Sequence, residues 1–211
     1  MPVYKTIQVS SQRTVCIWRI EETFEQMLSQ LNPNKEDYRL LHSFKSSKKQ
    51  LEWLAGRLTL KHLCQNLNIR YSGVVKDAHG KPSLRSHPHE ISLTHSFPYV
   101  AAIIDSNLPV GIDLEQPKSK IVKIAPKFLN NKELRFGGQN AVKLNMMWCI
   151  KETLYKIYGK KGLIFKKHLD IQPFNEQRDK LIVGNIIANS TVESYKLAFM
   201  INSEYILTYN V

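Results

Sequence analysis

The chain has 211 residues and carries 30 Lys and Arg against 18 Asp and Glu, which gives a formal net charge of +12. This length can bury a core without disulfide staples, and the three cysteines, Cys16, Cys64 and Cys149, form neither a disulfide framework nor a Cys-x-x-Cys zinc pattern. No uncharged apolar run reaches the ~18 residues of a membrane span, and Lys5 and Arg13 interrupt any signal-peptide core, so we expect a cytoplasmic protein that does not bind membranes.

The excess positive charge predicts a polyanionic partner, which would be nucleic acid, anionic lipid, a phosphorylated cofactor or an acidic protein. The basic residues form short clusters at 45–49, 118–123, 159–162 and 166–167. Aromatic residues are not interleaved with these clusters, as a stacking platform for single-stranded nucleic acid would require. Charge alone does not choose among these partners.

The first half of the chain shows helical patterns followed by strand patterns. A strand is expected first, then an amphipathic helix and a longer helical region, at residues 14–20, 21–31 and 34–68. Residues 77–84 have the Gly and Pro of a turn. Two apolar segments that follow, 90–96 and 99–105, read as antiparallel neighbours.

The second half repeats this order. A strand is expected at 111–115, followed by helices at 119–128, about 130–136 and 141–158, the last ending at Gly159. Four β-rich segments finish the chain, at 169–174, 180–188, 194–202 and 205–211.

The two halves therefore predict an α+β fold with two similar blocks, 1–107 and 108–211. Each block would pack helices on a small, mainly antiparallel sheet. The order of elements suggests an internal duplication, although no residue-level repeat is visible.

Acidic residues occur in two places where their geometry is defined. In "GIDLE", residues 111–115, the strand period of two puts Asp113 and Glu115 on one face, where their like charges repel. On the expected helix 141–158, Glu152 and Lys156 share the face opposite an apolar stripe. Each feature alone is most often a solvated turn or an exposed Glu–Lys pair worth ~0.3–0.5 kcal/mol.

The combination changes this interpretation. "GIDLE" followed by "WCIKETLYK", residues 148–156, resembles the paired signature of the 4′-phosphopantetheinyl transferases, G-[IV]-D-x-E and W-x-x-K-E-x-x-x-K. The resemblance extends to four more segments: "EWLAGR" (52–57), "GKPSL" (80–84), "SLTHS" (92–96) and "KGLIF" (161–165). Thr153 and Lys127 depart from the usual family residues.

The length resembles the surfactin-synthetase-activating type of this family, which is a pseudodimer in one chain. The resemblance implies two subdomains related by a pseudo-twofold axis, with the metal site on 108–211, and a monomeric protein. It implies an enzyme that transfers the phosphopantetheine arm of coenzyme A to a serine of an apo acyl or peptidyl carrier protein and releases adenosine 3′,5′-bisphosphate. The expected metal is Mg²⁺, or Mn²⁺ in its place, and the expected partner is an acidic carrier protein rather than nucleic acid or a membrane.

The resemblance also implies the site residues. Asp113, Glu115 and Glu152 would hold the metal, because phosphoryl transfer depends on charge neutralisation that a hard cation supplies. Glu152 is also the candidate base for the serine proton, and Lys156 would pair with the leaving phosphate. The implied contacts to coenzyme A are His95 at the pyrophosphate, Arg57 and Lys81 at the 3′-phosphate, Gly80 and Pro82 near the adenine, and Thr94 beside His95.

Other interpretations stay open at this point. A histidine such as His95, taken alone, is more often a core residue, and Lys151 either steers a phosphate or is solvated. Trp148 and Tyr155 are expected to pack. A metal-dependent phosphodiesterase or nuclease would share the acids but need no carrier protein, and a basic nucleic-acid-binding protein would explain the charge but not the acids.

Overall fold

The computed structural model describes residues 3–211 and divides into two compact units. One unit comprises Met1–Asp77 and Pro82–Leu108, and the other comprises Ala78–Lys81 and Pro109–Val211. The division after Leu108 lies one residue beyond the expected one, and the loop Ala78–Lys81 belongs to the second unit. Of the helices in the described part of the chain, none is long and apolar enough to cross a membrane.

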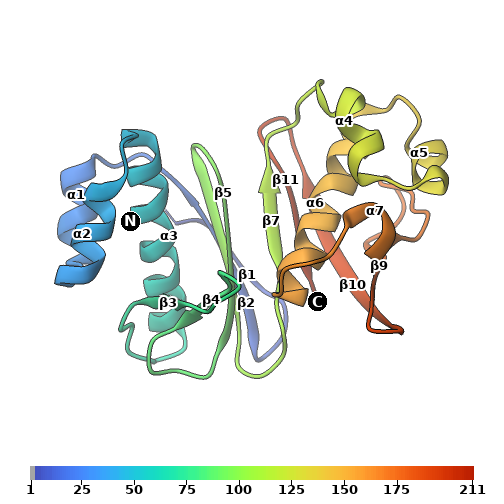
Figure 1. Cartoon of the computed structure of the whole chain (residues 1–211). Coiled ribbons are helices and arrows are strands. Elements are labelled where there is room, and N and C mark those ends of the chain that lie inside the picture. The colour runs from blue at the N-terminus through green and yellow to red at the C-terminus, as the bar shows by residue number, and fades with distance from the viewer. Residues whose placement is uncertain (1–2) are drawn as a thin grey trace. The chain divides into compact units, whose positions relative to one another are not determined.

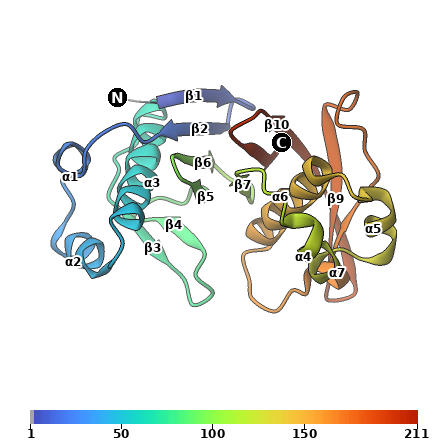
Figure 2. The ribbon, with the colours of Figure 1, turned by 90° about the horizontal axis from the view of Figure 1, so that it is seen from above.

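The described strands of the first unit form a six-stranded antiparallel sheet in the order β1-β2-β6-β5-β4-β3. Figure 2 shows β1 and β2 side by side. The strand β6 is buried along its whole length because it lies inside the sheet and under a helix. The bounds are β1 Val3–Gln8, β2 Arg13–Arg19, β3 Val74–Lys76, β4 Pro82–Leu84, β5 Glu90–Ser96 and β6 Tyr99–Asp105.

Three helices, α1 (Phe24–Leu31), α2 (Lys35–Ser43) and α3 (Ser47–Asn66), accompany this sheet, with α3 packed on β2 and β6. The single helical region expected at 34–68 is two helices. Phe44 leaves the helical conformation, and the Gln50 side chain donates to the Phe44 carbonyl at 3.2 Å, which satisfies an acceptor at the end of α2.

The second unit has a five-stranded antiparallel sheet, among the described residues, in the order β7-β11-β10-β9-β8. The strands are β7 Ile112–Glu115, β8 Leu169–Ile171, β9 Leu181–Ala188, β10 Thr191–Ile201 and β11 Ile206–Asn210. Its helices are α4 Ile121–Phe128, α5 Asn131–Gly137, α6 Ala141–Tyr158 and α7 Phe165–His168. Two antiparallel sheets with helices confirm the α+β class (Figure 1).

The helix α6 is the central element of the second unit and packs on β7, β8, β9 and β11. It begins where the Asn140 side chain accepts from the backbone N–H of Lys143, and it ends at Gly159, whose φ of 66° is left-handed. These two caps explain why the predicted limits, 141–158, are confirmed. The predicted apolar stripe is buried as well.

The strand β7 reaches α6 through a glycine that has no room for a side chain. A Cβ at Gly111 would collide with the backbone oxygen of Thr153 and would lie 2.7 Å from Cγ1 of Ile157. The Asn210 side chain accepts from the Gly111 N–H and donates to the Pro109 carbonyl, both at 2.9 Å. The entry of β7 is therefore fixed directly against α6.

We expect Gly111→Ala to destabilise the second unit, because β7 or α6 must move to accept the methyl group. Overpacking of this kind destabilises by about 1–3 kcal/mol. Gly56→Ala on α3 is the matched control, because its added Cβ would sit 3.6 Å from Leu93, an ordinary contact. Thermal unfolding should show a lower midpoint for Gly111→Ala than for Gly56→Ala, and equal midpoints would contradict the close approach.

Candidate functional site

Both acids of β7 lie on the face of the strand that α6 covers. Asp113 pairs in register with Thr208 of β11, and the Thr208 hydroxyl lies 2.6 Å from that of Thr153 on α6. Asp113 is 4% exposed, whereas Glu115, two residues further on, is half-buried. Burial raises the pKa of the Cys149 thiol on α6, and both carboxylates raise it further, which places their charge next to this helix.

Lys156 joins the helix to the strand. Its ammonium donates to Oδ1 of Asp113 at 2.7 Å and to the Ile112 carbonyl at 2.9 Å. The ion pair of this lysine therefore runs to Asp113 across the packed elements and is not the exposed Glu152–Lys156 pair that the helix spacing alone suggested. The predicted catalytic lysine and a predicted metal ligand lie together.

The pKa of the Glu152 carboxyl depends on the same group of charges. Burial raises the pKa of its carboxyl from the ordinary value of 4.5 to about 7, with Asp113 and Glu115 adding to the increase and Lys156 opposing it. Asp113, Glu115, Glu152 and Lys156 are thus electrostatically coupled. A carboxyl that titrates near neutrality is suited to accept a proton in general base catalysis.

Glu115 has one hydrogen-bond donor and one ion-pair partner that the sequence did not reveal. Nε1 of Trp148 donates to its Oε1 at 3.3 Å, and Nζ of Lys118 lies 3.7 Å from its Oε2. The backbone of Lys118 is in turn bound to the side chain of Asn145 on α6. Trp148 does pack, as expected, but it also contributes a hydrogen bond to a predicted site residue.

The structure corrects the expectation for Lys151. This residue neither steers a phosphate nor is solvated, because its side chain is fully buried. Its ammonium donates to Oε2 of Glu133 at 2.7 Å and to three backbone carbonyls. Helix periodicity predicted the direction of the side chain but could not show that other segments cover it.

Arg57, on α3 of the first unit, is buried, and no carboxylate in residues 3–211 forms an ion pair with it. The residue is 7% exposed, its guanidinium lies 4.8 Å from the ring centroid of Trp53, and Nε has no hydrogen-bond partner among the described residues. Burial lowers the pKa of Arg57, while Tyr71 and Asp37 raise it. A buried cationic group with an unsatisfied donor is unusual and favours an anionic ligand.

His95, on β5, is exposed over 62% of its side chain, so it is not a core histidine. Its Nδ1 lies 3.4 Å from Oε2 of Glu52, a buried carboxylate on α3. The neighbouring Thr94 is buried. His95 can therefore present its ring to a ligand while Glu52 contacts its Nδ1.

The loop predicted to contact the nucleotide lies against the end of α6. A Cβ on Gly159 would be 2.6 Å from Cδ of Lys81, so the lysine stem crosses this glycine. Lys161 donates to the Ala78 carbonyl at 3.4 Å and holds the loop. Gly80 has a φ of 89° and open space around it, and Pro82 begins β4.

The carboxylates of Asp113, Glu115 and Glu152 are ligands of the type that a divalent cation prefers, but they are not arranged as a complete metal site. Carboxylate oxygens are the preferred protein ligands of Mg²⁺, and their mutual repulsion at Glu152 favours a bound cation. Among residues 3–211, however, no three His, Cys, Asp or Glu side chains are already arranged to hold a metal. Asp113 is instead engaged by Lys156.

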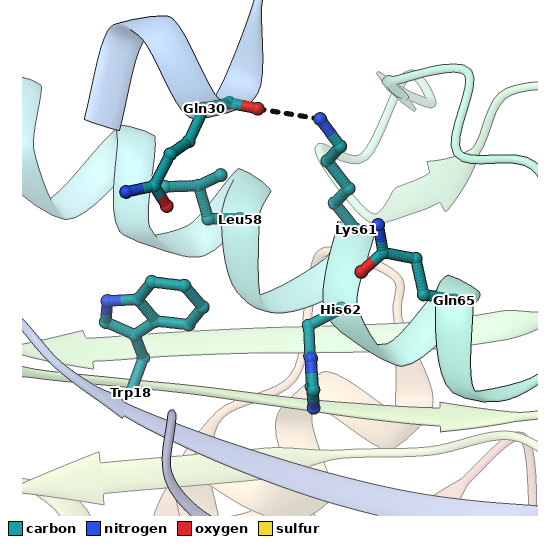
Figure 3. A pocket seen from close by; sticks show the side chains of 6 residues that line it. All are labelled: Trp18, Gln30, Leu58, Lys61, His62 and Gln65. Atoms are coloured by element: carbon teal, nitrogen blue, oxygen red, sulfur yellow. Dashed lines mark hydrogen bonds between the residues drawn. The ribbon is translucent and has the colours of Figure 1, made fainter. Parts of the chain in front are cut away.

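A pocket on the first unit lies elsewhere and contains none of the predicted site residues (Figure 3). It is lined by Trp18, Gln30, Leu58, Lys61, His62 and Gln65. The Lys61 ammonium donates to the Gln30 carbonyl at 2.7 Å and so links α3 to α1. Nothing in its lining provides acids or an unpaired cation comparable with Arg57, so we assign it no part in the site.

The raised pKa of Glu152 predicts a pH-dependent stability. Between pH 4.5 and about 7 this carboxyl is ionised in the unfolded chain but protonated in the folded one, so stability falls as the pH rises through this range. Glu152→Gln cannot ionise and should gain several degrees in Tm relative to the wild type between pH 5 and pH 8, measured with a chelator present. A Tm difference that does not change with pH would contradict this assignment.

Comparison with known proteins connects this geometry to a family. The sequence model of the 4′-phosphopantetheinyl transferase superfamily matches residues 109–209, which contain β7, α6 and all four coupled charges. The 4′-phosphopantetheinyl transferase gsp of Aneurinibacillus migulanus is 33% identical over 137 residues, 61% of this chain and 57% of the relative. The chain thus spans just over half the length of that relative. Through this matched segment and its paired signature, the second unit of the chain is similar to the 4′-phosphopantetheinyl transferase superfamily.

Proposed function

We propose that the protein transfers the 4′-phosphopantetheine group of coenzyme A to a serine of an apo acyl or peptidyl carrier protein and releases adenosine 3′,5′-bisphosphate. The observation that carries this proposal is the coupling of Asp113, Glu115, Glu152 and Lys156 between β7 and α6, inside the segment that matches the family. Carboxylates that can hold a cation and an ammonium that can neutralise phosphate charge are groups that phosphoryl transfer uses.

Asp113, Glu115 and Glu152 would hold the metal, Mg²⁺ or Mn²⁺. The bound cation would neutralise charge on the pyrophosphate. The raised pKa of Glu152 supports this assignment, because burial and the neighbouring carboxylates both disfavour its charged form and a bound cation would stabilise it.

Two residues of α6 would act on protons and charge. Glu152 would accept the proton of the attacking serine, since a pKa of about 7 suits a general base at neutral pH. Lys156 would stabilise the negative charge that develops on the leaving phosphate. Its present bond to Asp113 supports this role because it places the ammonium beside the acids.

The remaining predicted residues would bind coenzyme A. The unsatisfied Nε of Arg57 would gain an acceptor from the 3′-phosphate, and Lys81 would add a second cation there. His95, with Thr94 beside it, would donate to the pyrophosphate, while the open space at Gly80 and the start of β4 at Pro82 would leave room for the adenine.

The carrier protein that we propose as acceptor is acidic. The net charge of +12 and the exposed lysines on α4 and α7 support this choice, because opposite charges speed the encounter of two proteins. The monomeric state, the cytoplasmic location and the pseudo-twofold relation of the subdomains stay predictions.

The direct test is to incubate the protein with coenzyme A, Mg²⁺ and a panel of apo carrier proteins, and to weigh the carriers by mass spectrometry. We expect a carrier to gain the mass of phosphopantetheine on its serine and the nucleotide product to appear in equal amount. Hydrolysis of coenzyme A or of nucleic acid without a carrier would instead indicate a phosphodiesterase or nuclease.

Two variants control this assay. Asp113→Ala removes a predicted metal ligand and should abolish transfer while the protein stays folded, because one of three repelling charges is lost and the partly exposed Lys156 keeps the Ile112 carbonyl as an acceptor. Glu36→Ala removes an exposed carboxylate that pairs with Arg85 at 3.2 Å on the first unit, and it should leave transfer unchanged. Equal rates for the two variants would remove Asp113 from the reaction.

A further inference from the structure

The ammonium of Lys151 is a buried junction of four chain segments. It donates to the carbonyls of Phe128, Phe165 and Leu169 at 3.0, 3.2 and 2.8 Å and to Oε2 of Glu133 at 2.7 Å. An ammonium has only three N–H bonds, so these four oxygens use its whole donor capacity. Lys151 therefore connects α6 to the end of α4, to α5, and to both ends of α7.

Glu133 completes this junction and is itself satisfied. It is 2% exposed, its Oε2 also accepts from the Asn130 N–H at 2.8 Å, and its Oε1 accepts from the Ile171 N–H at 3.1 Å. A buried ion pair whose atoms all have partners holds its neighbours in one arrangement, whereas removing one partner leaves a buried charge. The Lys151–Glu133 pair therefore fixes the positions of the segments that it contacts.

Two of the segments that Lys151 holds also carry the rings that pack on Trp148. Phe128 stacks edge-on against the indole at a centroid distance of 5.0 Å, and Phe165 lies tilted against it at 5.7 Å. Lys151 thus binds the backbone of the same two residues whose side chains hold Trp148. The indole is set by packing on both phenylalanines, which leaves little freedom for its Nε1–H.

The indole N–H donates to Oε1 of Glu115 at 3.3 Å. We propose that Trp148 is a positioning residue that orients the Glu115 carboxylate, and that the Lys151–Glu133 pair positions Trp148 through Phe128 and Phe165. The effect of Trp148 on transfer rests on the proposed function, whereas its orientation of Glu115 does not. The connection from Lys151 to Glu115 is a property of the folded chain without metal or coenzyme A.

The connection is tested first in protein free of metal and substrate, labelled with 5-fluorotryptophan. Its ¹⁹F spectrum has one resonance for each of Trp18, Trp53 and Trp148, assigned by replacing each tryptophan with Phe. We expect Lys151→Met/Glu133→Gln to shift or broaden the Trp148 resonance and leave the other two in place. Glu115→Gln should shift the Trp148 resonance as well, because it changes the acceptor of the indole N–H.

The matched control is Lys143→Met/Glu176→Gln. It removes another Lys–Glu pair of α6, with a separation of 3.2 Å, whose lysine packs over Phe136 instead of contacting the rings at Trp148. All three resonances should stay in place. If the Lys151 double variant fails to fold, Glu133→Gln alone is measured in the same way, since it weakens the junction and keeps the lysine.

The second measurement concerns transfer. Trp148→Phe keeps an aromatic ring between Phe128 and Phe165 but removes the N–H, so the Mg²⁺ concentration for half-maximal rate should rise about 10–100-fold, as for other partners of metal ligands. The KM for coenzyme A should stay unchanged. Loss of a residue that only stabilised the fold would not raise the Mg²⁺ requirement while leaving the KM for coenzyme A unchanged.

The two measurements separate the possible failures. A Trp148 resonance that moves neither in the Lys151–Glu133 variant nor in Glu115→Gln would overturn the positioning role, whatever the enzyme does. An unchanged Mg²⁺ requirement in an active Trp148→Phe variant would overturn it too. Absence of transfer by the wild-type protein would contradict the proposed function, while the fluorine spectra would still decide the positioning role.

Discussion

The close contact of β7 with α6 at Gly111 is the constraint on which the candidate site depends. Because no side chain separates the strand from the helix there, the acids of β7 lie within reach of Glu152 and Lys156. The same contact concentrates negative charge in a partly buried place. This charge is balanced by an ion pair at Asp113 and by a hydrogen bond and an ion pair at Glu115, while burial raises the pKa of Glu152 to about 7.

This arrangement illustrates how a site can be stable and reactive at once. The coupled acids gain little from packing, since burial without a cation raises the free energy of their charged forms. The rigidity comes instead from neighbouring residues, where Lys151 donates to three backbone carbonyls and pairs with Glu133. The charges that would take part in transfer are therefore separate from the charges that hold the structure, although Lys151 and Glu152 are adjacent in sequence.

Local signals explain what the sequence could predict. The limits of α6 follow from the cap at Asn140 and the left-handed Gly159, and β5 and β6 follow from apolar alternation and burial. The edge strand β1 was missed because its side chains are mostly exposed and polar. The partners of Lys151 and Lys156 were missed because they lie 14 to 44 residues away in the chain and are brought close only by tertiary packing. Likewise, the link between Trp148 and Glu115 has no local sequence pattern.

The central claim is that the acids of β7 and α6 hold the metal of a transferase. Crystals grown with coenzyme A and Mn²⁺ test it most directly, because anomalous scattering locates the metal independently of any assay. The account predicts a peak within coordination distance of carboxylate oxygens of Asp113, Glu115 and Glu152, and a Lys156 ammonium that has left Asp113 for a phosphate oxygen. A bound metal away from these three carboxylates, with Lys156 still paired to Asp113, would contradict it.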